Sequence, residues 1–567
     1  MPNSKIVETL DRLSSKRPLK YAVYATAIAV FFALILLPPI LGIITKWDSI
    51  EAVLNDPDLT ARALNAVQNS FVIALLVSAL DVITGTPMAW LIARGKSRWL
   101  NILDTLADIP FIVPTVALGY SLLLFWSNPG GISSFFDSSL ISPGWLLVIL
   151  LHFTFSYPVV VRVLVGALLD YKIEYEQASR TLGAPPLTAS RTVTFAIIKP
   201  SLIAAFVLAF SRSLSETGAT FLVAGAFENG PVFIQNISNG FNAVPPQVSL
   251  LTYEGSLAFA SFILMAAAII VFALIYVIGS RLRLPVKRVW PSWERKLSYS
   301  KAAASRNTIT LLIFVVIVLI PSLFVALPAF QAVFTQSFAN SIAAKNIPNG
   351  VNWGDYWQSI LLSYLLAGVV TVLNVLIGLP MAIVIARKKV GKLLSGVLNV
   401  LVNIPLIVPS IALGVSMKFF WKGNFAFVPE ILLLIFAHLS ITYPYFVRSM
   451  SAATERISLD MEEASRTLGA KPLGVFRTII LPLTKYSILS GAIMVFTRSI
   501  SETGATVAVV TTLKTAPVVL VDWVPRFGVQ KVPASPLDIG LGCGYLILFS
   551  FIILLALRLV VRGRGRY

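Results

Sequence analysis

The stretch EEASRTLGAKP, residues 462–472, has a near copy, EQASRTLGAPP, at residues 176–186. Seven consecutive residues, Ala-Ser-Arg-Thr-Leu-Gly-Ala, are identical in the two copies. Three further pairs recur in the same order: PMAWLIAR (87–94) with PMAIVIAR (380–387), IPFIVPTVALG (109–119) with IPLIVPSIALG (404–414), and SRSLSETGAT (211–220) with TRSISETGAT (497–506). Self-similarity at a nearly constant offset indicates an internal duplication. The chain is therefore predicted to consist of two related halves.

The apolar composition predicts the fold class. Of the 567 residues, 57% are hydrophobic and only 13% are charged, which is not typical of a soluble protein. Runs such as 21–44 and 544–561 are long enough to cross a hydrocarbon core of about 30 Å as a helix of about 20 residues. Transmembrane β-strands would alternate in short segments instead. We therefore expect an all-α polytopic membrane protein.

Apolar runs mark about twelve transmembrane helices, six in each half. They lie at roughly 20–44, 70–93, 105–126, 145–169, 201–226, 256–280, 308–330, 359–386, 394–420, 428–450, 486–510 and 537–561. Six is an even number, so both halves insert in the same orientation. The sequence thus predicts two parallel six-helix repeats around a pseudo-twofold axis along the membrane normal.

The positive charge of the chain sets its orientation. Basic residues cluster at the N-terminus, in the connections after spans two, four and six, and at the C-terminus. All these segments fall on one side of a twelve-span topology, which the positive-inside rule makes the cytoplasmic side. Both termini are therefore expected in the cytoplasm. Because the net charge of +19 is explained by topology, we expect the lipid bilayer and no nucleic acid as a partner.

The domain organisation follows from the repeat. Residues 1–280 are predicted to form the first membrane domain, and residues 308–567 the second. Residues 281–307, which are basic and contain proline, are predicted to be a cytoplasmic linker. The repeated loops cover about 171–200 and about 455–485.

Each repeated loop lies between the fourth and fifth spans of its half. Its small residues leave a helix surface that another protein can approach closely, and Gly183 and Gly469 can turn the chain after that helix. An amphipathic loop that only connects two spans is the alternative. Seven identical residues, in halves whose spans have diverged, favour a docking surface.

The second loop resembles a known family motif. Glu463-Ala-Ser, then Gly469, and then Ile479, Leu481 and Pro482 are similar to the EAA loop in type I permease subunits of binding-protein-dependent ABC importers. In that family the loop forms a coupling helix that sits in a cleft of a cytoplasmic ATPase. The resemblance implies two fused permease domains and coupling roles for Gln177, Ala178, Gly183, Glu463, Ala464 and Gly469.

The first loop departs from this pattern. Gln177 replaces the acidic residue of the second loop, and 195–196 is Phe-Ala where the second loop has Leu-Pro. We therefore expect the two loops to dock unequally.

No ATP-binding site is expected in the chain itself. Its one Gly-Lys-Ser, at 95–97, is preceded by Trp90 where a phosphate-binding loop needs glycine. We expect no enzyme activity, catalytic residue, metal or cofactor here, and ATP with Mg²⁺ on a separate ATPase. Two loops imply two copies of that ATPase. The resemblance also implies an extracytoplasmic substrate-binding protein and the plasma or inner membrane of a prokaryote.

Ionisable residues inside the spans are candidates for the translocation pathway, because burying them in a membrane is costly. Arg212 and Glu216 are four residues apart, as are Arg498 and Glu502. We predict that each pair lies on one helical face and neutralises itself, near the midplane on the pseudo-twofold axis. A structural salt bridge between the halves is an equally supported alternative.

The two histidines, His152 and His438, occupy equivalent positions in the fourth spans. They are also pathway candidates by their place in the membrane. A ring bonded to the backbone of a neighbouring helix is the interpretation we favour.

The cargo is less well determined by the sequence. Arg-x-x-x-Glu-x-Gly-Ala in span five resembles sulfate and molybdate permeases, although Thr217 and Thr503 stand where an aromatic residue is usual. Double-length fusions also resemble ferric-iron and thiamine importers. An oxyanion would use the two arginines of span five, and a cation the two glutamates.

Other classes of protein remain as alternatives. An ion-coupled secondary transporter with parallel repeats would use Asp81, which has Asn374 at its repeat position, or Glu216 and Glu502. It gives no reason for a duplicated docking loop. A membrane-embedded enzyme lacks a metal cluster or nucleophile pair, and an interaction scaffold leaves the intramembrane charges unexplained.

Overall fold

The structure is a computed structural model that describes residues 14–95, 99–127, 131–136, 138–241, 249–281, 291–298, 300–347, 351–524 and 534–562. Over these ranges the chain is helical, and the one β pairing is an isolated bridge between Asn346 and Asn352. Residues 282–290 of the predicted linker, and the C-terminal basic residues after Arg562, lie outside the described ranges.

The first half contains these helical elements: α2 (Arg17–Val30), η1 (Phe31–Leu36), α3 (Leu37–Ile44), α4 (Trp47–Leu54), α5 (Pro57–Arg94), α6 (Trp99–Leu106), α7 (Ile109–Ile112), α8 (Thr115–Trp126), η2 (Ile132–Phe135), α9 (Trp145–Asp170), α10 (Glu174–Thr181), α11 (Pro186–Ala189), η3 (Ser190–Thr194), α12 (Phe195–Ser215), α13 (Gly218–Val223), α14 (Gly230–Phe241) and α15 (Leu250–Arg281). The helix α16 (Pro291–Leu297) follows within the predicted linker.

The second half repeats this order: α17 (Ser300–Ile313), η4 (Phe314–Leu319), α18 (Ile320–Leu323), α19 (Ala326–Val333), α20 (Gln336–Ile342), α21 (Trp353–Ala386), α22 (Lys392–Leu401), α23 (Ile404–Ile407), α24 (Ser410–Asn424), α25 (Glu430–Glu455), α26 (Leu459–Thr467), α27 (Pro472–Val475), η5 (Phe476–Ile480), α28 (Leu481–Ile500), α29 (Gly504–Val509), α30 (Ala516–Trp523) and α31 (Pro536–Arg562). The elements η1, η3, η4 and η5 are π-helical, and η2 is a 3₁₀ turn.

The described residues contain ten helices long and apolar enough to cross a membrane, or eleven if one bent pair counts as a span. The predicted all-helical polytopic fold is therefore confirmed, and the difference from twelve lies in the third span of each half. There α24 is bent by 104° from the helix before it, and its counterpart α8 is a 12-residue helix. Pro114 and Pro409 precede these helices with extended backbone, because proline cannot donate to a continuous helix.

The first span of each half packs against the other half. Ser440 of α25 donates a hydrogen bond to the Ile35 carbonyl at 3.0 Å, and Thr154 of α9 donates to the Ile317 carbonyl at 3.1 Å. The carbonyls belong to η1 and η4, whose widened turns leave backbone oxygens open to such partners. The two halves are therefore interlocked rather than separately packed.

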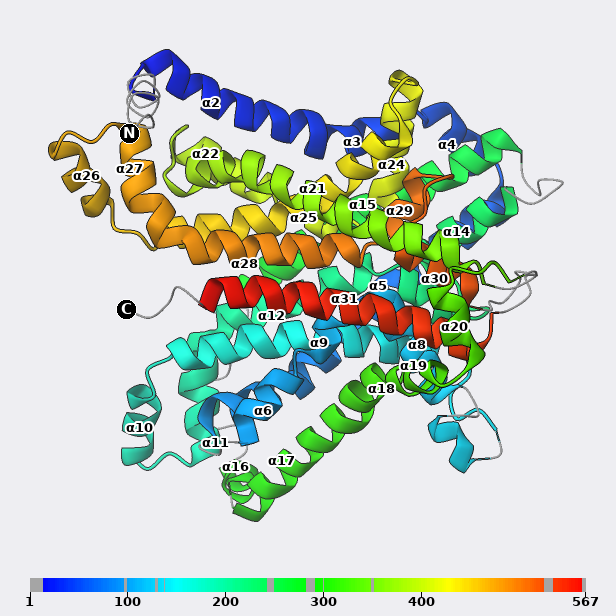
Figure 1. Ribbon diagram of the computed structural model, residues 1–567. Helices are drawn as coiled ribbons and strands as arrows, with labels where there is room; N and C mark the ends of the chain where they lie inside the picture. Colours follow the sequence, from blue (N-terminus) through cyan, green and yellow to red (C-terminus); the bar gives the residue numbers. More distant parts are fainter. Residues whose placement is uncertain are drawn as a thin grey trace.

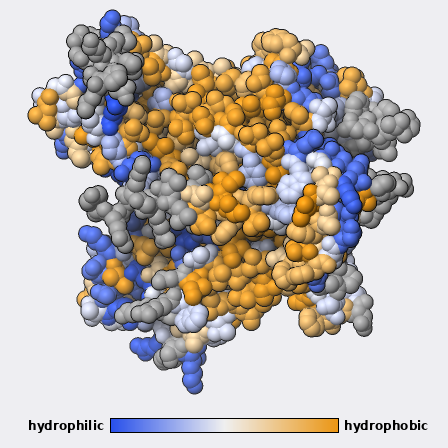
Figure 2. Space-filling view, in the orientation of Figure 1, coloured by the Kyte–Doolittle hydropathy of each residue, from blue (hydrophilic) through white to orange (hydrophobic). Residues whose placement is uncertain are grey.

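The long helices run roughly side by side, with α10 and α26 at one end of the bundle and α14 and α30 toward the other (Figure 1). We call these the α10/α26 end and the α14/α30 end. Hydrophobic residues cover the middle of the molecule and hydrophilic residues gather toward both ends (Figure 2). This pattern is the one expected of a bundle that spans a bilayer.

Candidate functional site

The fifth span of the first half is broken at the repeated Ser-Glu-Thr-Gly-Ala-Thr. The helix α12 ends at Ser215, Glu216 has an extended backbone (ψ 130°), and α13 begins at Gly218. The Glu216 carboxylate accepts a hydrogen bond from the Ala219 N–H at 3.0 Å, so it satisfies a donor that the second helix leaves open. The prediction of one continuous span through residue 226 is therefore wrong.

The second half breaks at the same place. The helix α28 ends at Ile500, α29 begins at Gly504, and Glu502 accepts from the Ala505 N–H at 2.9 Å. The prediction that each arginine and glutamate share one face of a continuous helix is wrong as well, because each glutamate lies beyond its helix end. The predicted neutralisation within the pair is confirmed for Arg498 and Glu502.

A histidine bridges the break in the first half. In α9, His152 is buried, with Nδ1 2.7 Å from the Ser213 hydroxyl and Nε2 2.8 Å from the Thr220 hydroxyl. The ring therefore ties the last turn of α12 to the start of α13. Its partners are side-chain hydroxyls, whereas we predicted a bond to the backbone of a neighbouring helix.

His438 of α25 repeats this arrangement. Its ring nitrogens are each 2.9 Å from a hydroxyl, one of Ser499 and one of Thr506. With both nitrogens engaged in both halves, the histidines have the geometry of positioning residues for the broken helices.

The two charged pairs differ between the halves. Arg498 forms an ion pair with Glu502, with 2.6 Å between Nη1 and Oε2. Arg212 is oriented differently: its Nε donates to the Phe155 carbonyl at 3.3 Å, and its guanidinium lies 3.8 Å from the centre of the Phe155 ring. The duplication has kept these charges but not their contacts.

The two breaks meet where the halves face each other. A Cβ added to Gly218 would lie 2.6 Å from the Thr503 Cβ, and one added to Gly504 would lie 2.6 Å from the Thr217 hydroxyl oxygen. Glycine is needed at both positions, because any side chain would force the halves apart.

Hydrogen bonds between the halves reinforce this contact. Thr115 of α8 donates to the Ser501 carbonyl at 3.3 Å, and Ser410 of α24 donates to the Ser215 carbonyl at 3.2 Å. Each third span thus holds the broken fifth span of the opposite half, as a pseudo-twofold axis requires.

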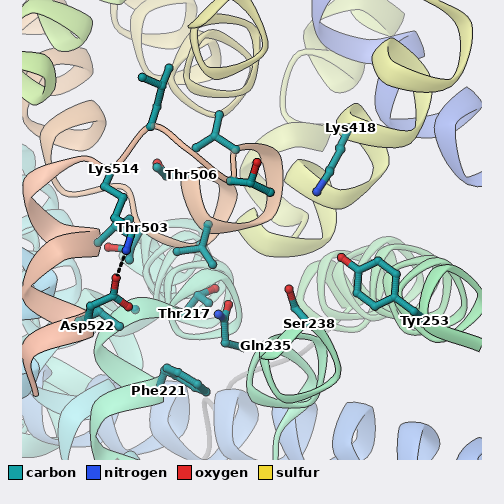
Figure 3. A pocket seen from close by; sticks show the side chains of 18 residues that line it. Thr217, Phe221, Gln235, Ser238, Tyr253, Lys418, Thr503, Thr506, Lys514 and Asp522 are labelled. Atoms are coloured by element: carbon teal, nitrogen blue, oxygen red, sulfur yellow. Dashed lines mark hydrogen bonds and ion pairs between the residues drawn. The ribbon is translucent and has the colours of Figure 1, made fainter. Parts of the chain in front are cut away.

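A cavity of about 520 Å³ opens beside this contact (Figure 3), and α14 and α30 supply part of its lining. Residues that line it include Thr217, Gly218, Lys418, Thr503 and Gly504. The six predicted pathway residues, Arg212, Glu216, Arg498, Glu502, His152 and His438, do not line it. Glu216 and Glu502 directly precede lining residues, and His438 is hydrogen-bonded to the lining residue Thr506.

Sequence reasoning missed Lys418 and the cavity-lining role of the two threonines. A signal for Lys418 was present, since a lysine stands inside the predicted span 394–420 where the repeat has Leu123. The threonines carried no separate signal, because only the helix breaks bring them together.

The repeated loops form exposed surfaces at the α10/α26 end. All six predicted coupling residues are solvent-exposed: Gln177, Ala178, Gly183, Glu463, Ala464 and Gly469. Both glycines have φ +89°, so the predicted turn is present in both copies.

Two further residues of these loops were missed. Leu182 and Leu468, which directly precede the glycines, are both 89% exposed. An apolar side chain held in solvent at the same place twice is a candidate contact for another protein. Identity between the copies was visible in the sequence, but exposure was not.

The helix α26 is anchored by a buried ion pair. Arg387, at the end of α21, lies 2.8 Å from the Glu462 carboxylate, and both side chains are at most 5% exposed. In the first half the equivalent Glu176 accepts a hydrogen bond from Thr194 at 3.0 Å, while Arg94 lies over the Tyr171 ring. The two loops therefore rest on different contacts.

The helix α16 of the predicted linker braces the first loop. Glu294 forms an ion pair with Arg191 at 2.8 Å and accepts a hydrogen bond from Thr188. The second loop has a different neighbour, since the Leu473 N–H donates to Ser14 at 3.2 Å. These contacts add to the asymmetry of the two loops.

Asp81 is the intramembrane acid that an ion-coupled transporter would require. It is fully buried and accepts a hydrogen bond from Ser156. In the second half the neutral Asn374 occupies the same position and donates to Thr442 at 2.8 Å. A neutral side chain therefore fits this site.

We expect Asp81→Asn to leave cargo uptake within about twofold of wild type, because the second half already uses asparagine there. Uptake into proteoliposomes checks this. A loss of more than tenfold in a variant that still assembles would indicate an essential acid at this position.

Comparison with known proteins identifies the family. The family model for the binding-protein-dependent transport system inner membrane component matches twice, at residues 85–284 and 374–562. The predicted duplication is therefore confirmed, with one copy of the domain in each half.

Individual relatives match about a third of the chain each. The sulfate transport system permease protein CysT of Salmonella typhimurium is 33% identical over 205 residues, covering 35% of this chain and 72% of its own length. The molybdenum transport system permease protein ModB of Mycobacterium tuberculosis is 33% identical over 208 residues, covering 36% and 76%. The sulfate transport system permease protein CysW of Escherichia coli is 29% identical over 225 residues, covering 39% and 72%. The chain is a multi-pass membrane protein that belongs to the family of binding-protein-dependent transport system inner membrane components and carries the family's domain twice.

Proposed function

We propose that the chain forms the translocation pathway of an ATP-driven importer for a tetrahedral oxyanion of the sulfate or molybdate type. The observation that supports this proposal most strongly is the cavity between the two family domains, which is lined by threonines, by Lys418 and by the ion pair of Lys514 and Asp522. The names of the sulfate and molybdenum permeases support the same class of cargo.

The geometry of the glutamates argues against a cationic cargo such as ferric iron or thiamine. Glu216 and Glu502 each accept a hydrogen bond from the backbone of the next helix, and Glu502 also pairs with Arg498. Both carboxylates are engaged within the protein and lie outside the cavity lining.

Two separate ATPase subunits would supply the energy, one at each repeated loop, and would hold ATP and Mg²⁺. The support is the pair of exposed loops with the same glycine turn and the same exposed leucine. Their end of the bundle would face the cytoplasm, with both termini, since the basic connections of the sequence fall there.

An extracytoplasmic binding protein would deliver the anion at the α14/α30 end, because α14 and α30 supply part of the cavity lining. The membrane would then be the plasma or inner membrane of a prokaryote. No hydrolytic step is assigned to this chain.

Native mass spectrometry of the chain purified with its ATPase tests the proposed assembly. We expect one copy of this chain and two copies of the ATPase. A complex with a single ATPase, or none under conditions that preserve related complexes, would contradict the proposal.

The two loop glycines offer a matched comparison. Gly183 and Gly469 share φ +89°, and a Cβ at either meets nothing within 4 Å. Alanine therefore introduces the same backbone strain in both loops, about 1–2 kcal/mol. We expect Gly469→Ala to reduce transport-coupled ATP hydrolysis more than Gly183→Ala, because the second loop follows the family motif more closely. Equal losses would show that the loops contribute equally.

A further inference from the structure

Lys418 places a positive charge at the cavity between the repeats, and the equivalent position in the first half is uncharged. Lys418 lies on α24, half-buried, and extends toward the cavity between α15 and α29 (Figure 3). The equivalent residue of α8 is Leu123. A lysine within a membrane-spanning helix is costly, so a neutral residue would suffice if this position only filled space.

The neighbouring charges are neutralised or engaged within the protein. Lys514 and Asp522, on the opposite side of the cavity, form an ion pair at 2.7 Å (Figure 3). Lys46 pairs with Glu254 at 2.7 Å, and one turn beyond Lys418 the Lys422 ammonium donates to the Val428 carbonyl.

Lys418 differs from these neighbours. Within the described part of the chain, its ammonium has neither a hydrogen bond nor an ion pair. Among the residues that line the cavity, Lys514 and Asp522 cancel each other, so the Lys418 ammonium has donors available to a ligand. The nearby Glu430 carboxylate is engaged by the Thr511 and Thr512 hydroxyls.

A second donor comes from the other half. Thr217 is only 5% exposed, and its hydroxyl oxygen has no hydrogen-bond partner among the described residues. A buried hydroxyl without a partner is costly unless a ligand or water completes it. Its repeat partner Thr503 is different, because that hydroxyl donates to the Ser501 carbonyl at 3.5 Å.

We propose that Lys418 and Thr217 bind a tetrahedral oxyanion as it enters the pathway from the α14/α30 end. This inference rests on the proposed oxyanion function and assigns its cargo contacts. Lysine supplies up to three N–H donors and a full charge, and the threonine hydroxyl supplies one more. Charge-assisted hydrogen bonds of this kind compensate an anion for the water that it loses. A cavity of about 520 Å³ also leaves room for part of the hydration shell, at about 30 Å³ per water.

Uptake of ³⁵S-sulfate and of molybdate by proteoliposomes tests the inference. The vesicles contain the full chain with its ATPase and binding protein. We expect Lys418→Met to lower the initial uptake rate at least tenfold and Lys418→Arg to retain most of it, since arginine keeps the charge. Thr217→Val, which preserves side-chain shape, should lower the rate several-fold.

Two matched controls accompany these variants. Thr503→Val changes the symmetry-related hydroxyl, which already has a protein partner, and should lower the rate less than Thr217→Val. Binding of the ATPase to each variant reports whether the complex has assembled, because none of these residues belongs to the loops at the α10/α26 end. If Lys418→Met fails to assemble, the difference in initial uptake rate between Thr217→Val and Thr503→Val tests the inference instead.

Wild-type vesicles that take up neither anion would overturn the proposed oxyanion function. Wild-type vesicles that transport an anion, with Lys418→Met or Thr217→Val equally active, would overturn the binding site and leave the proposed function standing.

Discussion

Replacing Leu468 with Asp is expected to uncouple the second loop from its ATPase, and combining it with Leu182→Asp should reduce ATP-driven uptake to background. Both leucines are 89% exposed in the isolated chain. Full burial of a leucine in a partner's cleft contributes about 1.5–3 kcal/mol, which corresponds to a change of about ten- to hundredfold in affinity for each loop. An aspartate in the same cleft would add a desolvation cost.

Affinity of the purified ATPase for the chain, measured by biolayer interferometry, checks this expectation. Leu468→Met is the control, because methionine keeps the apolar volume and should bind like wild type. Undiminished binding of the double aspartate variant would show that these leucines do not contact the ATPase.

Removing the buried carboxylate of Glu462 is expected to destabilise the second loop severely. Glu462→Ala leaves the Arg387 guanidinium buried without its carboxylate partner, and breaking such a pair typically costs about 3–5 kcal/mol. The equivalent change in the first half, Glu176→Ala, removes a hydrogen bond from Thr194 and should cost about 1 kcal/mol.

The thermal unfolding temperature of the detergent-solubilised chain provides the measurement. The double variant Arg387→Met with Glu462→Met should recover much of the loss, because an apolar pair can replace a buried ion pair. Equal shifts for the two alanine variants would mean that the ion pair does not anchor α26.

Much of the architecture was predictable because similar segments recur in the same order in the two halves of the sequence. Apolar runs located the spans to within a few residues of helices such as α9 and α25, predicted at 145–169 and 428–450. The turn at Gly183 and Gly469 was predictable too, because glycine tolerates positive φ.

The helix breaks in span five were not predictable from hydropathy. Residues 211–220 and 497–506 read as continuations of apolar helices. The carboxylates of Glu216 and Glu502 cap new helices there instead, and histidines from another span hold the breaks. These are tertiary contacts, which a local periodicity does not encode.

The exchange of first spans between the halves was hidden for a similar reason. Nothing in residues 21–44 specifies that Ile35 receives a hydrogen bond from Ser440, 405 residues away. The cavity depends on this interlocked packing, so its lining could not be derived from either half alone.

We expect this chain to transport its cargo only when ATPase subunits drive it. Uptake of ³⁵S-sulfate and molybdate by proteoliposomes with and without the ATPase measures this dependence. The binding protein is supplied on the α14/α30 side and ATP on the α10/α26 side. We expect uptake that requires both ATP and the ATPase and that is insensitive to collapse of the proton and sodium gradients. Uptake that persists without the ATPase and follows an ion gradient would show that the chain is a secondary transporter instead.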